Sequence, residues 1–279
     1  SPRSADRARV RELLAFGGWL TVSNVVGPLM VYFDRFVVGA VVGMAAVAFY
    51  TTPYEVVTRL WIVPDALFGV VFTALAMALA GNAERARGIY RGATQALTVA
   101  MTVPVAMIVL FAPEGLEAWL GPTFAVEGSA VLRWLAIGVF VNSFARLPFA
   151  ALQAAGRPDL TAKLHLVELL PYLVVLWILT STFGIAGTAA AWTLRIAADT
   201  LLLFWLGHVQ VPALRSEQLR ALAFAVVGGA CLGCLAALDD SGAKAEIAVL
   251  VTVIGLAVAA RERRAMRLIF APPTGRASR

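Results

Sequence analysis

Long apolar runs separated by short polar segments make up most of this chain. A run of about 20 apolar residues has the length that crosses a bilayer as a helix. The hydropathy pattern predicts eight such spans, at 13–36, 47–80, 92–112, 130–154, 160–182, 185–207, 219–238 and 245–260. We therefore expect an all-α polytopic membrane protein with about eight transmembrane helices and no β-sheet.

The amino-acid composition excludes an ordinary soluble domain. Hydrophobic residues make up 60% and charged residues 14% of the 279 residues, and the mean hydropathy is +0.82. Soluble domains carry about 25% charged residues. The net charge of +6 does not indicate nucleic-acid binding, because the basic residues stand at the ends of apolar runs instead of forming one continuous face.

The basic residues predict the orientation in the membrane. With a cytoplasmic N-terminus, seventeen of them fall in cytoplasmic segments and only Arg35 and Lys244 fall in outer loops. Cytoplasmic loops of membrane proteins carry the excess of Lys and Arg. Both termini are therefore expected in the cytoplasm. The absence of an initiator Met indicates a piece of a longer protein.

Ionisable residues inside the apolar spans are the candidate functional residues, because a charge near mid-membrane is costly and normally faces a partner or a wet cavity. Toward the outer side lie Asp34, Arg35, Glu55 and Arg59. At greater depth, on four different spans, lie Asp65, Arg146, Glu168, Arg195 and Asp199, together with the neutral Asn142.

Helical spacing predicts two acid–base pairs among these residues. Glu55 and Arg59 are four residues apart, so they share one helix face and can pair. Arg195 and Asp199 have the same spacing. Such a pair either holds helices together or belongs to a substrate site, and the sequence leaves both interpretations open.

Catalytic and metal-binding motifs are not indicated by the sequence. Cys231 and Cys234 lie in an apolar run without further ligands nearby, and His165 with Glu168 would form only half of a metal site. The sequence also lacks a nucleophile motif and a Gly-rich phosphate loop. We therefore expect no enzyme activity, no metal and no cofactor.

Three stretches resemble oligosaccharide flippases of the multidrug/oligosaccharidyl-lipid/polysaccharide exporter superfamily. FGGWLTVSN, PLMVYFDRFVVG and YTTPYEVVTRLWIVPDAL are similar to the seventh and eighth helices of that family. LRWLAIGVFVNSFARLPFAALQAAGRP is similar to the tenth helix. Residues 156–204 resemble the eleventh and twelfth helices, including the H-x-x-E and R-x-x-x-D spacings. The resemblance covers about residues 12–207.

This resemblance implies a domain organisation. Family members have two six-helix lobes, often followed by two additional helices. By similarity, residues 1–12 are a basic cytoplasmic segment and residues 13–207 are the second six-helix lobe. Residues 208–279 are then a linker, two additional transmembrane helices and a basic cytoplasmic tail. The first lobe of the same protein would be the missing partner of this chain.

The resemblance also implies a function in cell-surface polysaccharide biosynthesis, such as that of the O-antigen of lipopolysaccharide. A polyprenyl-diphosphate-linked oligosaccharide would cross the bacterial cytoplasmic (inner) membrane by alternating access, driven by an ion gradient. Membrane lipids, a polysaccharide polymerase and glycosyltransferases are the further expected partners. The alternatives are a drug or ion antiporter of the same fold, and a membrane scaffold that transports nothing.

Under the flippase hypothesis the interior residues divide into two roles. The expected substrate-binding residues are Arg59, Arg146, Arg195 and Asn142, because guanidinium groups suit phosphate. The expected ion-coupling or orienting residues are Asp34, Glu55, Asp65, Glu168 and Asp199. An acid beside each base would offset the cost of a mid-membrane charge until an anionic ligand arrives.

Overall fold

The structure, a computed structural model, describes residues 32–238 and 241–270, the latter with side chains from 242 to 257. A helical segment at 32–41 is followed by α2 (Met44–Thr58), η1 (Arg59–Trp61), α3 (Ile62–Leu79), α4 (Ala83–Leu110), α5 (Ala112–Leu120), α6 (Pro122–Ala154), α7 (Pro158–Gln210), η2 (Pro212–Leu214), α8 (Arg215–Ala236) and α9 (Ser241–Phe270). Every regular element in these two ranges is helical, which confirms the predicted all-α fold. The basic segment 1–12 and most of the predicted span 13–36 lie outside the described residues.

Five stretches of the described chain are long and apolar enough to cross a membrane. They are Met44–Leu79, Ala83–Leu110, Pro122–Ala154, Pro158–Gln210 and Pro212–Ala236. Six of the eight predicted spans fall in these stretches, because Pro158–Gln210 contains both 160–182 and 185–207. The span predicted at 245–260 falls in α9, where side chains are described only as far as 257, and it stays a prediction.

The long helix α7 is a hairpin of two helical legs. The legs meet at Gly184, which has a φ of 60° and a ψ of −142°. This left-handed backbone favours glycine. Just beyond the turn, a Cβ on Gly187 would collide with the backbone carbonyl of Leu179, so the legs can approach closely only with glycine here. The hydroxyls of Thr180 and Thr188 then join the two legs at 2.8 Å.

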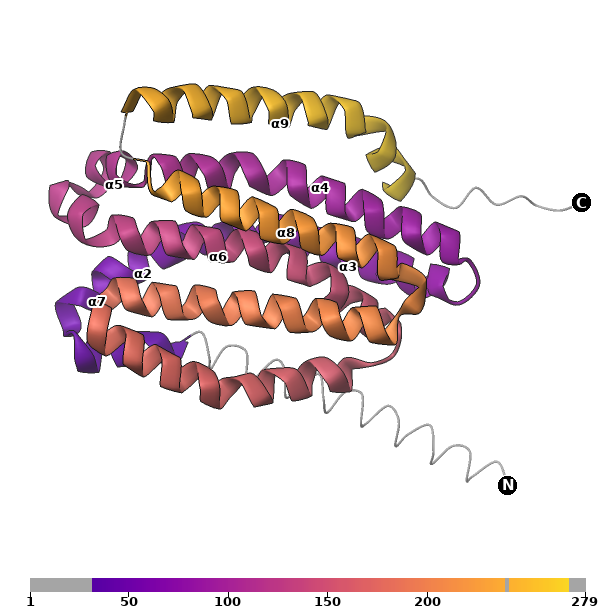
Figure 1. Cartoon of the computed structure of the whole chain (residues 1–279), viewed down its shortest axis with the longest axis horizontal. Coiled ribbons are helices and arrows are strands. Elements are labelled where there is room, and N and C mark those ends of the chain that lie inside the picture. Colours follow the sequence, from indigo (N-terminus) through magenta and orange to yellow (C-terminus); the bar gives the residue numbers. More distant parts are fainter. Residues whose placement is uncertain (1–31, 239–240, 271–279) are drawn as a thin grey trace, which may run out of the picture.

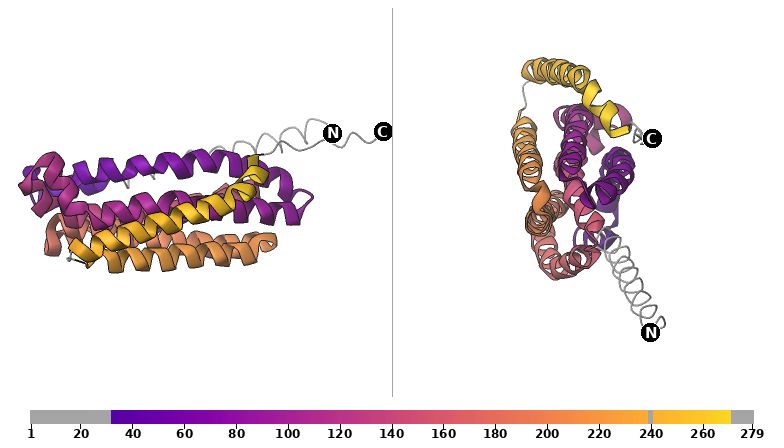
Figure 2. Two further views of the ribbon diagram at one scale, coloured as in Figure 1. Left: turned by 90° about the horizontal axis from the view of Figure 1, so that it is seen from above. Right: turned by 90° about the vertical axis from the view of Figure 1, so that its right-hand side faces the viewer.

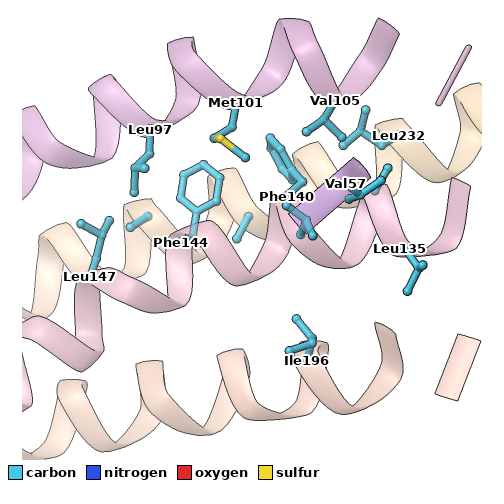
Figure 3. Packing of buried hydrophobic residues seen from close by; sticks show 14 of the residues in the cluster. Val57, Leu97, Met101, Val105, Leu135, Phe140, Phe144, Leu147, Ile196 and Leu232 are labelled. Atoms are coloured by element: carbon cyan, nitrogen blue, oxygen red, sulfur yellow. The ribbon is translucent and has the colours of Figure 1, made fainter. Parts of the chain in front are cut away.

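Helix α6 lies at the centre of the bundle and contacts α2, α3, α4, α5, α7 and α8 (Figures 1 and 2). Figure 3 shows Phe140 and Phe144 of α6 between Met101 of α4 and Ile196 of α7. On the second leg of α7, the fully buried Trp192 packs against Gly138 of α6. A Cβ added to Gly138 would lie 2.5 Å from the ring of Trp192. Lipid tails are as apolar as these side chains, so close packing, and not burial from water, holds such helices together.

The outer surfaces of α7 and α8 expose large apolar side chains, which include Val167, Leu170, Trp177, Phe224 and Val227. Apolar patches of this kind are rare on soluble monomers. They are expected where a helix faces hydrocarbon. The surface of the bundle therefore agrees with the membrane location that the spans predict.

Basic side chains tie the elements together at one end of the bundle. Glu217 of α8 is almost fully buried and accepts two bonds from the guanidinium of Arg91 in α4, at 2.8 and 3.2 Å. Arg220 donates to the same carboxylate at 3.1 Å. Nearby, Arg87 of α4 donates to the carbonyl of Ala213 at 3.0 Å. The bonds of Arg87 and Arg91 attach η2 and α8 to α4.

Candidate functional site

Buried polar side chains gather between the helical segment 32–41, α2 and α7, in the apolar interior of the bundle. The carboxylate of Asp34 is fully buried and accepts hydrogen bonds from the Tyr50 hydroxyl and from the backbone N–H of Arg35. Asp34 is thus held by its own helix and by α2, and a buried carboxylate without such donors would be costly.

A pair of carboxyls, separate from Asp34, lies within the α7 hairpin. Glu168 of the first leg and Asp199 of the second are both buried, and their carboxyls lie close enough to interact electrostatically. The Nε2 atom of His165 is 3.6 Å from Asp199. Both carboxyl oxygens of Glu168 and the Oδ1 atom of Asp199 have no hydrogen-bond partner among the described residues. Two adjacent buried carboxyls without hydrogen-bond donors are costly as two charges, and a proton on one of them lowers that cost.

Arg195 of α7 acts electrostatically on both groups of carboxyls, on Asp34 and on Glu168 with Asp199. Its guanidinium lies over the ring of Tyr172, 5.4 Å from the ring centroid. Its Nε atom is buried without a described partner. One guanidinium is thus coupled electrostatically to three buried carboxyls.

The predicted pairing of Glu55 with Arg59 is wrong. Glu55 instead forms an ion pair with Arg35, at 2.9 Å from Nη2 to Oε1. Arg35 reaches it from the neighbouring helical segment 32–41, where its guanidinium also lies over the rings of Tyr32 and Tyr54, at 5.0 and 5.3 Å. Arg59 is exposed and forms no ion pair with any residue that the structure describes.

The predicted pairing of Arg195 with Asp199 is also wrong. Asp199 is nearest to His165 from the other leg of the hairpin, and Arg195 points to Tyr172. The physical reason is the same in both cases. Spacing of four residues places two side chains on one helix face, but a closer partner from another helix decides the contact.

Two further predicted residues lie on the face that α3 and α6 share. Arg146 of α6 pairs with Asp65 of α3 at 2.8 Å, and both side chains remain partly exposed. Asn142 precedes Arg146 by one helical turn and is half-buried without a hydrogen bond to the rest of the described chain. Arg146 also acts electrostatically on Asp199, so this pair stands at the edge of the buried carboxyl site.

Sequence reasoning missed the tyrosines and His165 as parts of the site. The rings of Tyr54 and Tyr172 lie against the guanidinium groups of Arg35 and Arg195. Tyr50 packs against Tyr54 and donates to Asp34. Tyr50 and Tyr54 are four residues apart on α2, and Tyr172 follows Glu168 by the same interval. The sequence signal that could have identified these tyrosines was their spacing of four residues, next to acidic residues within apolar spans.

This arrangement defines the class of protein. Charged side chains that are buried within membrane spans, and only partly neutralised, are typical of transporters. The comparisons with known proteins agree. The family model described as "Polysaccharide biosynthesis protein" matches residues 2–126. This match and the two curated relatives described next support membership of the polysaccharide flippase family, and the chain is a multi-pass membrane protein.

Two curated relatives are much longer than the part of them that this chain matches. The chain is 37% identical to the "Putative O-antigen transporter" of Shigella flexneri over 199 residues, which cover 70% of the chain and 46% of that protein. It is 24% identical to the "Probable low-salt glycan biosynthesis flippase Agl15" of Haloferax volcanii over 69% of the chain and 41% of that protein. The chain therefore spans less than half the length of these relatives. No solved structure matches it.

Proposed function

We propose that this chain is one lobe of a flippase that moves a lipid-linked oligosaccharide across the bacterial cytoplasmic membrane. It would act in O-antigen or related polysaccharide assembly, beside glycosyltransferases and a polymerase, and without catalysing a reaction. Similarity to the Shigella transporter and the Haloferax flippase supports this role. The observation that carries it is a set of three buried carboxyls, those of Asp34, Glu168 and Asp199, on which the half-buried Arg195 acts.

The missing first lobe of the transporter would cover the exposed face of α2 and α3. Glu55, Arg59 and Asp65 are exposed there, although they belong to apolar helices. Hydrocarbon is a poor neighbour for three charges on one face, whereas a facing lobe with a wet cavity between accommodates them. Residues 13–207 would form the lobe described here, and α8 and α9 would be additional helices.

The orientation follows from the basic end of the bundle. Arg85, Arg87, Arg91, Arg215 and Arg220 lie at the end where α3 meets α4 and α7 meets α8. The excess of basic residues marks the cytoplasmic side. The other end, where α5 turns back toward α6, would face outward, and both termini would be cytoplasmic.

In the proposed mechanism the Glu168–Asp199 pair takes up the coupling cation. While the pair is empty, its negative charge holds the guanidinium of Arg195. A proton or metal cation at the pair removes that attraction, and Arg195 and Arg146 can then turn to the diphosphate, for which Arg offers two parallel hydrogen bonds. Asn142 would add a neutral donor beside Arg146. Cation binding and substrate binding thereby become linked through one side chain.

The test uses the full-length protein in cells, with surface polysaccharide and membrane abundance measured together. Arg195→Ala should reduce export at least about tenfold while the protein remains in the membrane, since a charge-assisted contact contributes about 1.5–3 kcal/mol. Arg195→Lys should rescue export only in part, because an ammonium cannot form the bidentate contact. Glu127→Gln, which changes an exposed carboxylate on α6 away from the cluster, is the control and should export normally.

Joint replacement of Arg195 and Asp199 by apolar residues separates transport from scaffolding. Buried charges of opposite sign that have only a structural role can be replaced together by apolar residues without loss of stability. We therefore expect the double variant to reach normal abundance and yet to export nothing. Restored export in this variant would refute the proposed site.

A further inference from the structure

Two joined pockets lie between α2 and α5, apart from the buried carboxyl cluster. One is an apolar groove with a volume of about 490 Å³, and the other is a smaller polar pocket of about 350 Å³. Val56 and Trp119 line both pockets, so they meet at these two side chains. Together they form one crevice with an apolar part and a polar part.

The apolar part has the size and lining of a site for a hydrocarbon chain. Its walls come from α2, α4, α5 and α6 and include Pro53, Met107, Phe111 and Leu116. The volume lies within the range of about 300–1,000 Å³ that is usual for small-ligand pockets. Gly115 lines the groove without any atom within 4 Å of the position of a Cβ, so the space in front of α5 is open.

The polar part carries a single unneutralised positive charge. Arg59 lines it and has no ion pair within the described chain, while the charge of its neighbour Glu55 is balanced by Arg35. Thr52 adds a hydroxyl without a described hydrogen bond, and Thr51 donates its own proton to Val47 and keeps its oxygen lone pairs. The pocket thus offers one net positive charge, with hydroxyl groups beside it, to an anion.

Trp119 marks the boundary between the two parts. The side chain is 62% exposed, and it belongs to the short helix α5 at the end of the bundle. Tryptophan is enriched at the level where lipid headgroups meet hydrocarbon. A ligand that follows the crevice would therefore have its charged group at the membrane surface and its chain in the apolar layer.

We propose that this crevice binds one anionic phospholipid of the membrane, with its phosphodiester at Arg59 and one acyl chain in the groove beside Gly115. A phosphodiester carries one negative charge and matches the single free guanidinium. The diphosphate of a transported lipid would bring more negative charge than this pocket neutralises. The residues that line the crevice do not include Asp34, Glu168, Arg195 or Asp199, so the crevice is separate from the proposed transport site.

The helical segment 32–41 does not fill the apolar part of the crevice. It approaches α2 from the side of α7, where Val37 packs with Tyr172 and Leu176. The apolar part opens on the side of α2 that faces α4 and α5.

The test measures lipid binding to the purified full-length protein after delipidation in neutral detergent. Phosphatidylglycerol, the uncharged diacylglycerol and a polyprenyl diphosphate are added separately, and bound lipid is counted by native mass spectrometry. Wild type should bind one phosphatidylglycerol and raise its melting temperature. Arg59→Gln should weaken this binding at least about tenfold, because a charge-assisted phosphate contact is lost.

Gly115→Leu should fill the groove and abolish the same binding event without a steric clash. Its matched control is Gly88→Leu on α4, another helical glycine with no atom near the position of a Cβ, which should bind phosphatidylglycerol like wild type. The proposal fails if Gly115→Leu or Arg59→Gln binds the lipid like wild type, if diacylglycerol binds as well as phosphatidylglycerol, or if polyprenyl diphosphate binds wild type more tightly than phosphatidylglycerol and loses that binding in Arg59→Gln. Surface polysaccharide does not enter this test, so its outcome is independent of the transport proposal.

Discussion

Neutralising Glu217 should detach α8 from the rest of the bundle, and the effect can be sized from the contacts. The carboxylate is 3% exposed and holds Arg91 through two bonds, whereas the arginines Arg91 and Arg220 are 51% and 61% exposed. A hydrogen bond to a charged group contributes about 1.5–3 kcal/mol when both partners are shielded. Because both guanidiniums regain water once released, each pair is closer to the 0–1 kcal/mol of surface pairs. We expect Glu217→Gln to lower stability by about 1–3 kcal/mol.

The assay is thermal unfolding of the purified protein in detergent. For a chain of this size, about 1 kcal/mol corresponds to about 2–4 °C in melting temperature. Glu217→Gln should therefore melt at least about 2 °C below wild type. The matched control is Glu84→Gln, because Glu84 pairs with Arg87 at 3.1 Å but is 80% exposed. That variant should change the free energy of unfolding by less than about 0.5 kcal/mol. Equal melting temperatures for the two variants would refute the claim that burial makes the Glu217 contacts strong.

Two further predictions concern the other end of the bundle. Burial by itself would raise the pKa of Glu114, but its hydrogen bonds and the ammonium of Lys244, 3.0 Å away, lower that pKa below 4.5. This stabilisation of α9 should be present above about pH 4.5 and be lost as the pH falls through the lowered value. Hydrogen exchange of α9 should then differ between wild type and Glu114→Gln at pH 7 and coincide once the pH lies below the lowered pKa of Glu114, and a difference that persists there would contradict this linkage. Reporter fusions should read cytoplasmic after Gly81 and external near Gly121, with the opposite pattern refuting the orientation.

The spans could be predicted from sequence because a hydrophobic run of bilayer length can satisfy its backbone hydrogen bonds in lipid as a helix. The turns at Gly156 and Gly184 were also predictable, since glycine next to a helix end allows a left-handed backbone, and both residues have positive φ. The ion pairs could not be predicted, because Arg35 approaches Glu55 across a turn and His165 approaches Asp199 across the α7 hairpin. Such contacts depend on how the helices pack against one another. The spacing of residues along a single helix carries no information about that packing.

The bonds that join the helical segment 32–41 to α2 bear on how this chain enters a membrane. Asp34 and Arg35 find their partners Tyr50 and Glu55 only sixteen and twenty residues later in the sequence. A lone charged residue at the centre of a span raises the insertion free energy by about 2.5–3.5 kcal/mol. During synthesis, the first of these helices therefore gains its stable place in the bilayer once α2 has left the ribosome. The two helices should leave the translocon as a pair.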